Sequence, residues 1–102
     1  MSPTTPVVAI YPGSFDPITR GHEDIARRTL RVADEVIIAV AHSPSTDKRN
    51  LFTPDERVQL INEVFADDDR VRAESFGGLL VDFARDRQAI FVIRGLRAIS
   101  DF

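Results

Sequence analysis

Apolar runs divide the chain into alternating strand-like and helix-like segments. Residues 7–11 and 35–41 carry nearly continuous apolar runs, which are typical of strands covered on both faces. Residues 71–76 alternate between apolar and polar side chains, and residues 89–93 form another apolar run that we expect to be buried on both sides. Pro12-Gly13 marks a sharp turn after the first run. The pattern therefore predicts four strands.

Three helices are predicted between these strands. Residues 21–33 place Ile25, Thr29 and Val32 on one face. Thr53, Pro54 and Glu56 form a capping box with proline at the first helical position, which indicates a second helix start. Its apolar stripe is Val58, Ile61, Val64 and Phe65. Residues 79–87 form the third helix, with Leu80, Phe83 and Ala84 facing inward, and residues 42–50 are expected to be a loop.

The alternation of strands and helices predicts an α/β fold, a Rossmann-like doubly wound parallel sheet with helices on both faces. We interpret residues 1–102 as a single domain. Ligands of such sheets bind beyond the carboxyl ends of the strands, near the point where strand order reverses. Residues 12–22, 42–50 and 94–102 should therefore converge on one site.

Composition and charge exclude several classes of protein. The chain has 102 residues, a formal net charge of -3 and no cysteine, so disulfides, thiolate nucleophiles and cysteine-ligated zinc are absent. An acidic chain is a poor candidate for nucleic-acid binding. No apolar run approaches the ~18 residues of a membrane span, and no signal pattern is seen at the N-terminus. We therefore expect a cytoplasmic protein with neither nucleic-acid nor membrane partners.

The segment after the first strand is the richest in candidate chemistry. Neither G-x-G-x-x-G nor a Gly-Lys-Ser/Thr phosphate loop occurs in the chain. Instead, Gly21-His22 opens the predicted helix, where free amides and the helix dipole attract anions and a histidine adds a donor. The alternative is a plain turn in which Asp16 or Thr19 caps the helix and His22 lies exposed in its first turn.

A longer pattern links this segment to a known family. Gly-Ser-Phe-Asp-Pro at residues 13–17, followed by Ile-Thr-x-Gly-His at 18–22, resembles the signature of the nucleotidyltransferase superfamily. Three further stretches resemble the narrower phosphopantetheine adenylyltransferase family: Ser43-Pro44-Ser45 with Lys48, residues 51–57, and residues 93–102. The resemblance runs from about Val8 to the last residue.

The resemblance implies a reaction and its partners. Members of the family transfer the adenylyl group of ATP to 4'-phosphopantetheine, giving dephospho-coenzyme A and pyrophosphate in coenzyme A biosynthesis. They use magnesium and assemble as homohexamers. The attacking group is an anionic phosphate, so positioning and charge stabilisation can replace a strong general base.

The resemblance also implies roles for individual residues. His22 would contact the α-phosphate, Ser14 would bind near the reacting phosphates, and the backbone of Phe15 would lie near ATP. Arg94 would bind the phosphate of phosphopantetheine. Residues with further implied contacts are Gly95, Leu96 and Arg97 on ATP, and Leu79 and Leu80 beside the pantetheine arm. Core packing remains an alternative for the two leucines, and a surface location for the arginines.

The assignment of Lys48 to the family's positively charged loop position depends on how the loop is aligned. The loop between Ser45 and Phe52 is about two residues longer than the family pattern, so counting back from Phe52 reaches Lys48. Counting forward from Ser45 instead reaches Thr46, which carries no charge, and Arg49 is another candidate for the positive charge. A solvated lysine in a loop is the alternative. The sequence identifies no metal ligands, and Asp16 is not assigned as one.

One departure affects the functional hypothesis. Family members continue beyond the position of Phe102 through a glutamate-containing helix to a second, Ser-rich nucleotide-binding motif, so the chain resembles their N-terminal two-thirds. It is therefore expected to be truncated at its C-terminus. Two alternatives to full adenylyl transfer stay open: a nucleotide-binding fragment without turnover, and another small-molecule nucleotidyltransferase acting on nicotinamide mononucleotide or glycerol phosphate.

Overall fold

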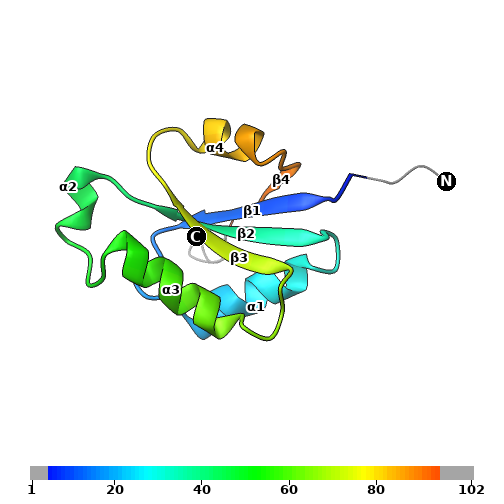
Figure 1. Cartoon of the computed structure of the whole chain (residues 1–102), viewed down its shortest axis with the longest axis horizontal. Helices are drawn as coiled ribbons and strands as arrows, with labels where there is room; N and C mark the ends of the chain where they lie inside the picture. The colour runs from blue at the N-terminus through cyan, green and yellow to red at the C-terminus, as the bar shows by residue number, and fades with distance from the viewer. Residues whose placement is uncertain (1–4, 95–102) are drawn as a thin grey trace, which may run out of the picture.

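A four-stranded parallel sheet forms the centre of the molecule, which is described by a computed structural model for residues 5–94 (Figure 1). The strands lie in the order β3-β2-β1-β4. Their bounds are β1 Val8–Gly13, β2 Glu35–Ala41, β3 Val71–Phe76 and β4 Phe91–Val92. Ile10 of β1 pairs with Ile37 on one side and Val92 on the other, so β1 lies inside the sheet.

Helices cover both faces of the sheet, as predicted. Helix α1, Arg20–Thr29, and helix α3, Pro54–Val64, lie on one face, and helix α4, Leu80–Asp86, lies on the other (Figure 1). The chain builds β1, β2 and β3 outward in one direction and then returns to place β4 beside β1. The strand order therefore reverses between β1 and β4, which confirms the doubly wound, Rossmann-like fold.

Each face of the sheet has its own apolar core. Val36, Ile38 and Val40 of β2 pack in one cluster with Ile61 and Phe65 from the α3 side. The alternate β2 residues, Ile37 and Ala39, pack on the other face against Phe83 and Ala84 of α4. All five central residues of β2 are 0% exposed, which confirms the reading of a strand covered on both faces.

Two elements next to the predicted site begin or end elsewhere than expected. Strand β1 continues through Pro12 and Gly13, which pair with Ala39 and Val40, although these residues were predicted to turn. Proline is tolerated there because, among residues 5–94, only β2 pairs with that part of β1. Helix α1 ends at Thr29 and not near Ala33, which leaves Val32 in a turn and 66% exposed.

Two other expectations were wrong. The predicted loop at residues 42–50 contains a short helix, α2, Pro44–Asp47, which begins at Pro44 because the Ser43 side chain accepts a hydrogen bond from the Thr46 amide. Strand β4 is not buried on both sides: Phe91 and Val92 are 42% and 47% exposed. An apolar run predicts a strand but does not show whether further elements cover it. Within residues 5–94, no helix is long and apolar enough to cross a membrane.

The central strand should dominate stability. Ile38→Ala removes a fully buried side chain from the α1–α3 face, and we expect it to lower the free energy of unfolding by about 2–5 kcal/mol. Val32→Ala, at an exposed turn position, is the control and should change it by less than about 0.5 kcal/mol. Urea unfolding followed by circular dichroism measures both, and equal losses would contradict this account of the core.

Candidate functional site

The turn after β1 is built around the buried ring of Phe15. Phe15 is 2% exposed and has a φ of 46°, in the left-handed region that side-chain-bearing residues seldom adopt. Its ring meets Tyr11 and His22 edge to face, with centroids 5.2 and 4.9 Å away. A Cβ on Gly13 would lie 3.0 Å from this ring, so the close packing favours glycine at that position.

Asp16 joins this turn to the segment that precedes α3. Its carboxylate oxygens accept hydrogen bonds from the backbone amides of Leu51 at 2.6 Å and Phe52 at 2.9 Å. Of the two caps considered from the sequence, Thr19 caps α1 and Asp16 does not. Asp16 therefore stabilises the contact between two loops at the carboxyl edge of the sheet.

His22 occupies the third position of α1, where its ring takes part in the helix cap. The Thr19 amide donates to His22 Nδ1 at 3.0 Å, and the His22 amide donates to Thr19 Oγ1 at 3.3 Å. The ring also packs against Phe15 and Tyr11, so His22 is not the freely exposed residue of the alternative reading. Partial burial lowers the pKa of His22 below its usual value, because desolvation disfavours the charged imidazolium.

Arg57 is the structural residue that sequence reasoning missed. It is 0% exposed, and its guanidinium donates to the carbonyl oxygens of Ser14 at 2.8 Å, Phe52 at 3.1 Å and Ala41 at 3.3 Å. It also pairs with Asp47 Oδ1 at 3.2 Å. One side chain thus holds together the ends of β1 and β2, helix α2 and the start of α3. The only available signal was an arginine on the apolar stripe of a predicted helix, one residue before Val58.

Lys48 and Arg49 lie immediately after α2, at the carboxyl edge beyond β2. Both are exposed, whereas Asp47 faces inward and contacts Arg57. Thr46 points its hydroxyl back to Ser43, at 2.9 Å from Ser43 Oγ. Lys48 and Arg49, the two cationic candidates for the family's positive charge, are therefore both exposed. Thr46, the third candidate, takes part in the cap of α2.

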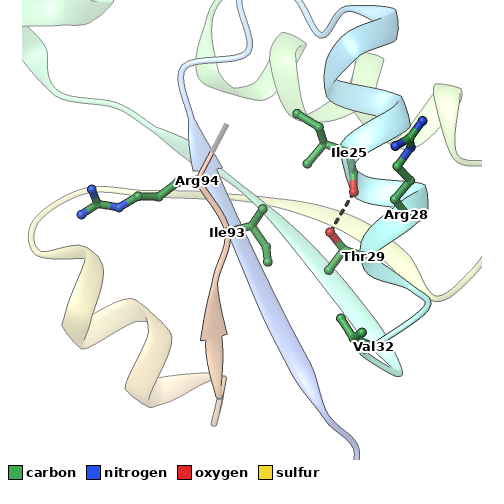
Figure 2. Close-up of a pocket in the computed structure, with 6 residues that line it drawn as sticks. All are labelled: Ile25, Arg28, Thr29, Val32, Ile93 and Arg94. Atoms are coloured by element: carbon green, nitrogen blue, oxygen red, sulfur yellow. Dashed lines mark hydrogen bonds between the residues drawn. The ribbon is translucent and has the colours of Figure 1, made fainter. Parts of the chain in front are cut away.

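Arg94 follows β4 at the same edge of the sheet, and its side chain is exposed. Figure 2 shows Arg94 and Ile93 extending from opposite sides of the chain, with Ile93 directed toward Ile25 and Thr29 of α1. These residues belong to an open, largely apolar groove of about 310 Å³ between α1 and β4 (Figure 2). His22, Ser14 and Lys48 do not line this groove.

The remaining predicted residues fall in three groups. Ser14 is exposed at the end of β1, and its carbonyl oxygen is the one bound by Arg57. Leu79 is 66% exposed, whereas Leu80 is half-buried against the α4-side core, so core packing holds for one of the two leucines. Gly95, Leu96 and Arg97 lie outside the described residues.

The described residues offer no cluster of metal-ligating side chains. Between residues 5 and 94, no group of three or more His, Cys, Asp or Glu side chains is placed to hold an ion. The carboxylate of Asp16, in the turn after β1, accepts two backbone hydrogen bonds.

The carboxyl edge of the sheet places the turn after β1 beside the reversal of strand order between β1 and β4. The family model described as cytidylyltransferase-like matches residues 10–102. The chain belongs to the cytidylyltransferase-like family. Within that family, the chain is 56% identical over 96 residues to the phosphopantetheine adenylyltransferase of Thiobacillus denitrificans, and 57% identical over 95 residues to that of Clostridium novyi.

These relatives are longer than the chain. The matches cover 94% and 93% of this chain but 59% and 58% of the two relatives. The cytidylyltransferase-like chain thus spans about three-fifths of the length of the curated relatives it matches. The matched span nevertheless includes the turn after β1, the segment around α2 and Arg94, so the resemblance to phosphopantetheine adenylyltransferases is confirmed.

Solved structures support the fold. A lipopolysaccharide core biosynthesis protein from Thermoplasma volcanium superposes with a TM-score of 0.66 at 17% identity, covering 86% of this chain and 73% of that one. A bifunctional NMN adenylyltransferase/ADP ribose pyrophosphatase from Francisella tularensis, complexed with AMP and a Mn ion, gives a TM-score of 0.59 at 21% identity. That match covers 82% of this chain and 25% of that one.

The partial burial of the His22 ring should be detectable in the pH dependence of stability. Because its pKa is lowered in the folded chain, the unfolded chain takes up the proton first as pH falls below about 6.5. The free energy of unfolding should therefore fall more steeply below that pH in the wild-type chain than in His22→Gln. Urea unfolding across a pH series measures the difference, and parallel curves would contradict it.

Arg57 should be critical for stability. Arg57→Met keeps the length of the side chain but leaves three carbonyl oxygens and Asp47 without their donor, and should lower the free energy of unfolding by about 2–5 kcal/mol. Arg49→Met, at an exposed position, is the matched control and should change it by less than about 0.5 kcal/mol. Thermal and urea unfolding measure both variants. Equal losses of unfolding free energy in Arg57→Met and Arg49→Met would contradict the structural role of Arg57.

Proposed function

We propose that the chain is the first part of a phosphopantetheine adenylyltransferase, which transfers the adenylyl group of ATP to 4'-phosphopantetheine in coenzyme A biosynthesis. The observation that carries the proposal is the 56% identity to a relative of that name across 94% of this chain. In this proposal residues 1–102 belong to one nucleotidyltransferase domain, and the rest of that domain follows Phe102.

The reaction is a displacement at phosphorus. A phosphate oxygen of 4'-phosphopantetheine attacks the α-phosphorus of ATP, the bond to the bridging oxygen of the β-phosphate breaks, and pyrophosphate leaves with that electron pair. The nucleophile is already ionised, so the site needs no strong base. It needs alignment of the two substrates and donors for the charge that develops on the α-phosphate oxygens.

The residues at the carboxyl edge would divide these tasks. His22 and the first turn of α1 would donate to the α-phosphate, and Ser14 and the backbone of Phe15 would lie beside the reacting phosphates. Lys48 and Arg94 would neutralise the phosphate of the acceptor from opposite sides of the site. Leu80 would contact the pantetheine arm, and Gly95, Leu96 and Arg97 would contact ATP.

The proposal also includes a metal ion, an oligomeric state and a cellular location. ATP would enter with a magnesium ion held mainly by its phosphate oxygens and water. The Mn ion and AMP belong to a structural neighbour of low identity and support only a nucleotide-binding fold. We further propose a cytoplasmic homohexamer, in keeping with the family resemblance.

Pyrophosphate release tests the proposal. With ATP and magnesium, release should require 4'-phosphopantetheine and should not occur with nicotinamide mononucleotide, nor with glycerol phosphate supplied with CTP. The assay is run on this chain and on a polypeptide of the relatives' full length. Release only by the longer polypeptide, with ATP binding by both, would make this chain a nucleotide-binding fragment. Release with another acceptor would replace the proposed substrate.

Two variants of the longer polypeptide separate the proposed roles. His22→Ala removes a donor to the α-phosphate and should lower kcat by about 10²–10³-fold. Arg94→Ala removes a charge from the acceptor site and should mainly raise KM for 4'-phosphopantetheine, by about tenfold or more. Arg31→Ala, at an exposed position in the turn after α1, is a control for loss of a surface charge. The reverse pattern of kcat and KM effects would exchange the two roles.

A further inference from the structure

Between residues 5 and 94, the hydrogen bonds to the His22 ring all reach Nδ1, and all come from Thr19. The peptide N–H of Thr19 donates to His22 Nδ1 at 3.0 Å, and Thr19 Oγ1 lies 3.1 Å from the same nitrogen. The Thr19 hydroxyl oxygen also accepts from the His22 amide, which completes the cap of α1. The peptide N–H can act only as a donor, so Nδ1 must present its lone pair to it.

This contact determines where the proton of a neutral His22 resides. A ring nitrogen that accepts a hydrogen bond carries no proton, and the proton of neutral imidazole then belongs to the other nitrogen. Protonation of Nδ1 would bring two N–H groups against each other at the start of the helix. Partial burial against Tyr11 and Phe15 also disfavours the doubly protonated ring.

We propose that Thr19, through its peptide N–H, is a positioning residue that keeps the proton of His22 on Nε2, so that the ring acts as a neutral hydrogen-bond donor. The role of that donor in adenylyl transfer rests on the proposed function, whereas the position of the proton does not. A donor fixed in this way needs no tautomer change before it binds a phosphate oxygen. The fixed ring thereby avoids a reorganisation that a free histidine would undergo.

The position of the proton can be measured directly in the unliganded chain. In the ¹⁵N-labelled protein at neutral pH, long-range ¹H–¹⁵N correlation spectra distinguish a protonated from an unprotonated ring nitrogen. We expect Nε2 to be protonated in about tenfold excess, the ratio that corresponds to one net hydrogen bond of about 1.4 kcal/mol. His42→Gln leaves His22 as the only histidine and assigns its signals.

The hydrogen bond itself has a spectroscopic signature. A scalar coupling between the amide nitrogen of Thr19 and Nδ1 of His22 should be visible across the N–H···N bond in the unmodified chain. Thr19→Val removes the hydroxyl but keeps the peptide N–H, so the proton should stay on Nε2. The fold of this variant is checked by circular dichroism, and the coupling in the unmodified chain does not depend on it.

Three results would overturn the inference: a proton on Nδ1, a near-equal mixture of the two tautomers, or transfer of the preference to Nδ1 in Thr19→Val. The last would show that the hydroxyl, and not the peptide group, sets the proton. Because no substrate is present in these spectra, failure here is distinct from failure of the proposed adenylyl transfer, which the pyrophosphate assay tests.

Discussion

The buried guanidinium of Arg57 is the interaction on which the arrangement of the carboxyl edge depends. Parallel strands bring their ends to one edge, but they do not fix the loops that leave them. Arg57 does so by binding the carbonyl oxygens of Ser14 and Ala41, which follow β1 and end β2, together with Asp47 of α2. A fully buried charge is tolerated because these acceptors replace the water that it loses. The Asp16 carboxylate connects the turn after β1 to the segment before α3 by accepting from two backbone amides. Backbone carbonyl oxygens thus stabilise the positive charge of Arg57, and backbone N–H groups stabilise the negative charge of Asp16.

The fold followed from features that are local in the sequence. The β2 run predicted a strand buried on both faces because its apolar residues are consecutive, and the Thr53 capping box predicted the start of α3 within one turn. Helix α1 and strand β4 were less predictable. Thr29 ends α1 although the apolar spacing continues to Val32, and the exposure of Phe91 depends on what else covers the sheet edge. Neither property is encoded in periodicity alone.

The candidate site was less predictable from the sequence than the fold. Gly21-His22 could be located because a helix start leaves signals in the sequence, and the family resemblance added Ser14 and Arg94. The contacts that orient them could not be found in this way. Arg57 and Ser14 are 43 residues apart, and Asp16 and Leu51 are 35 apart, so only the folded chain brings each pair together. Thr19 was considered as a cap, but nothing in its sequence neighbourhood indicated that its peptide group would also bind the histidine ring.

The hydrogen bonds of Arg57 affect where the chain can tolerate insertions. Its acceptors include Ala41 and Asp47 on one side of residues 48–51 and the Phe52 carbonyl on the other, so both ends of this short segment are held. Extra residues between such anchors lengthen a loop whose closure entropy grows only slowly with length. Extra residues in this segment would thus be accommodated in solvent without displacing either strand end. Length variation among homologues should accumulate here, and the same segment is a natural place to insert a reporter group.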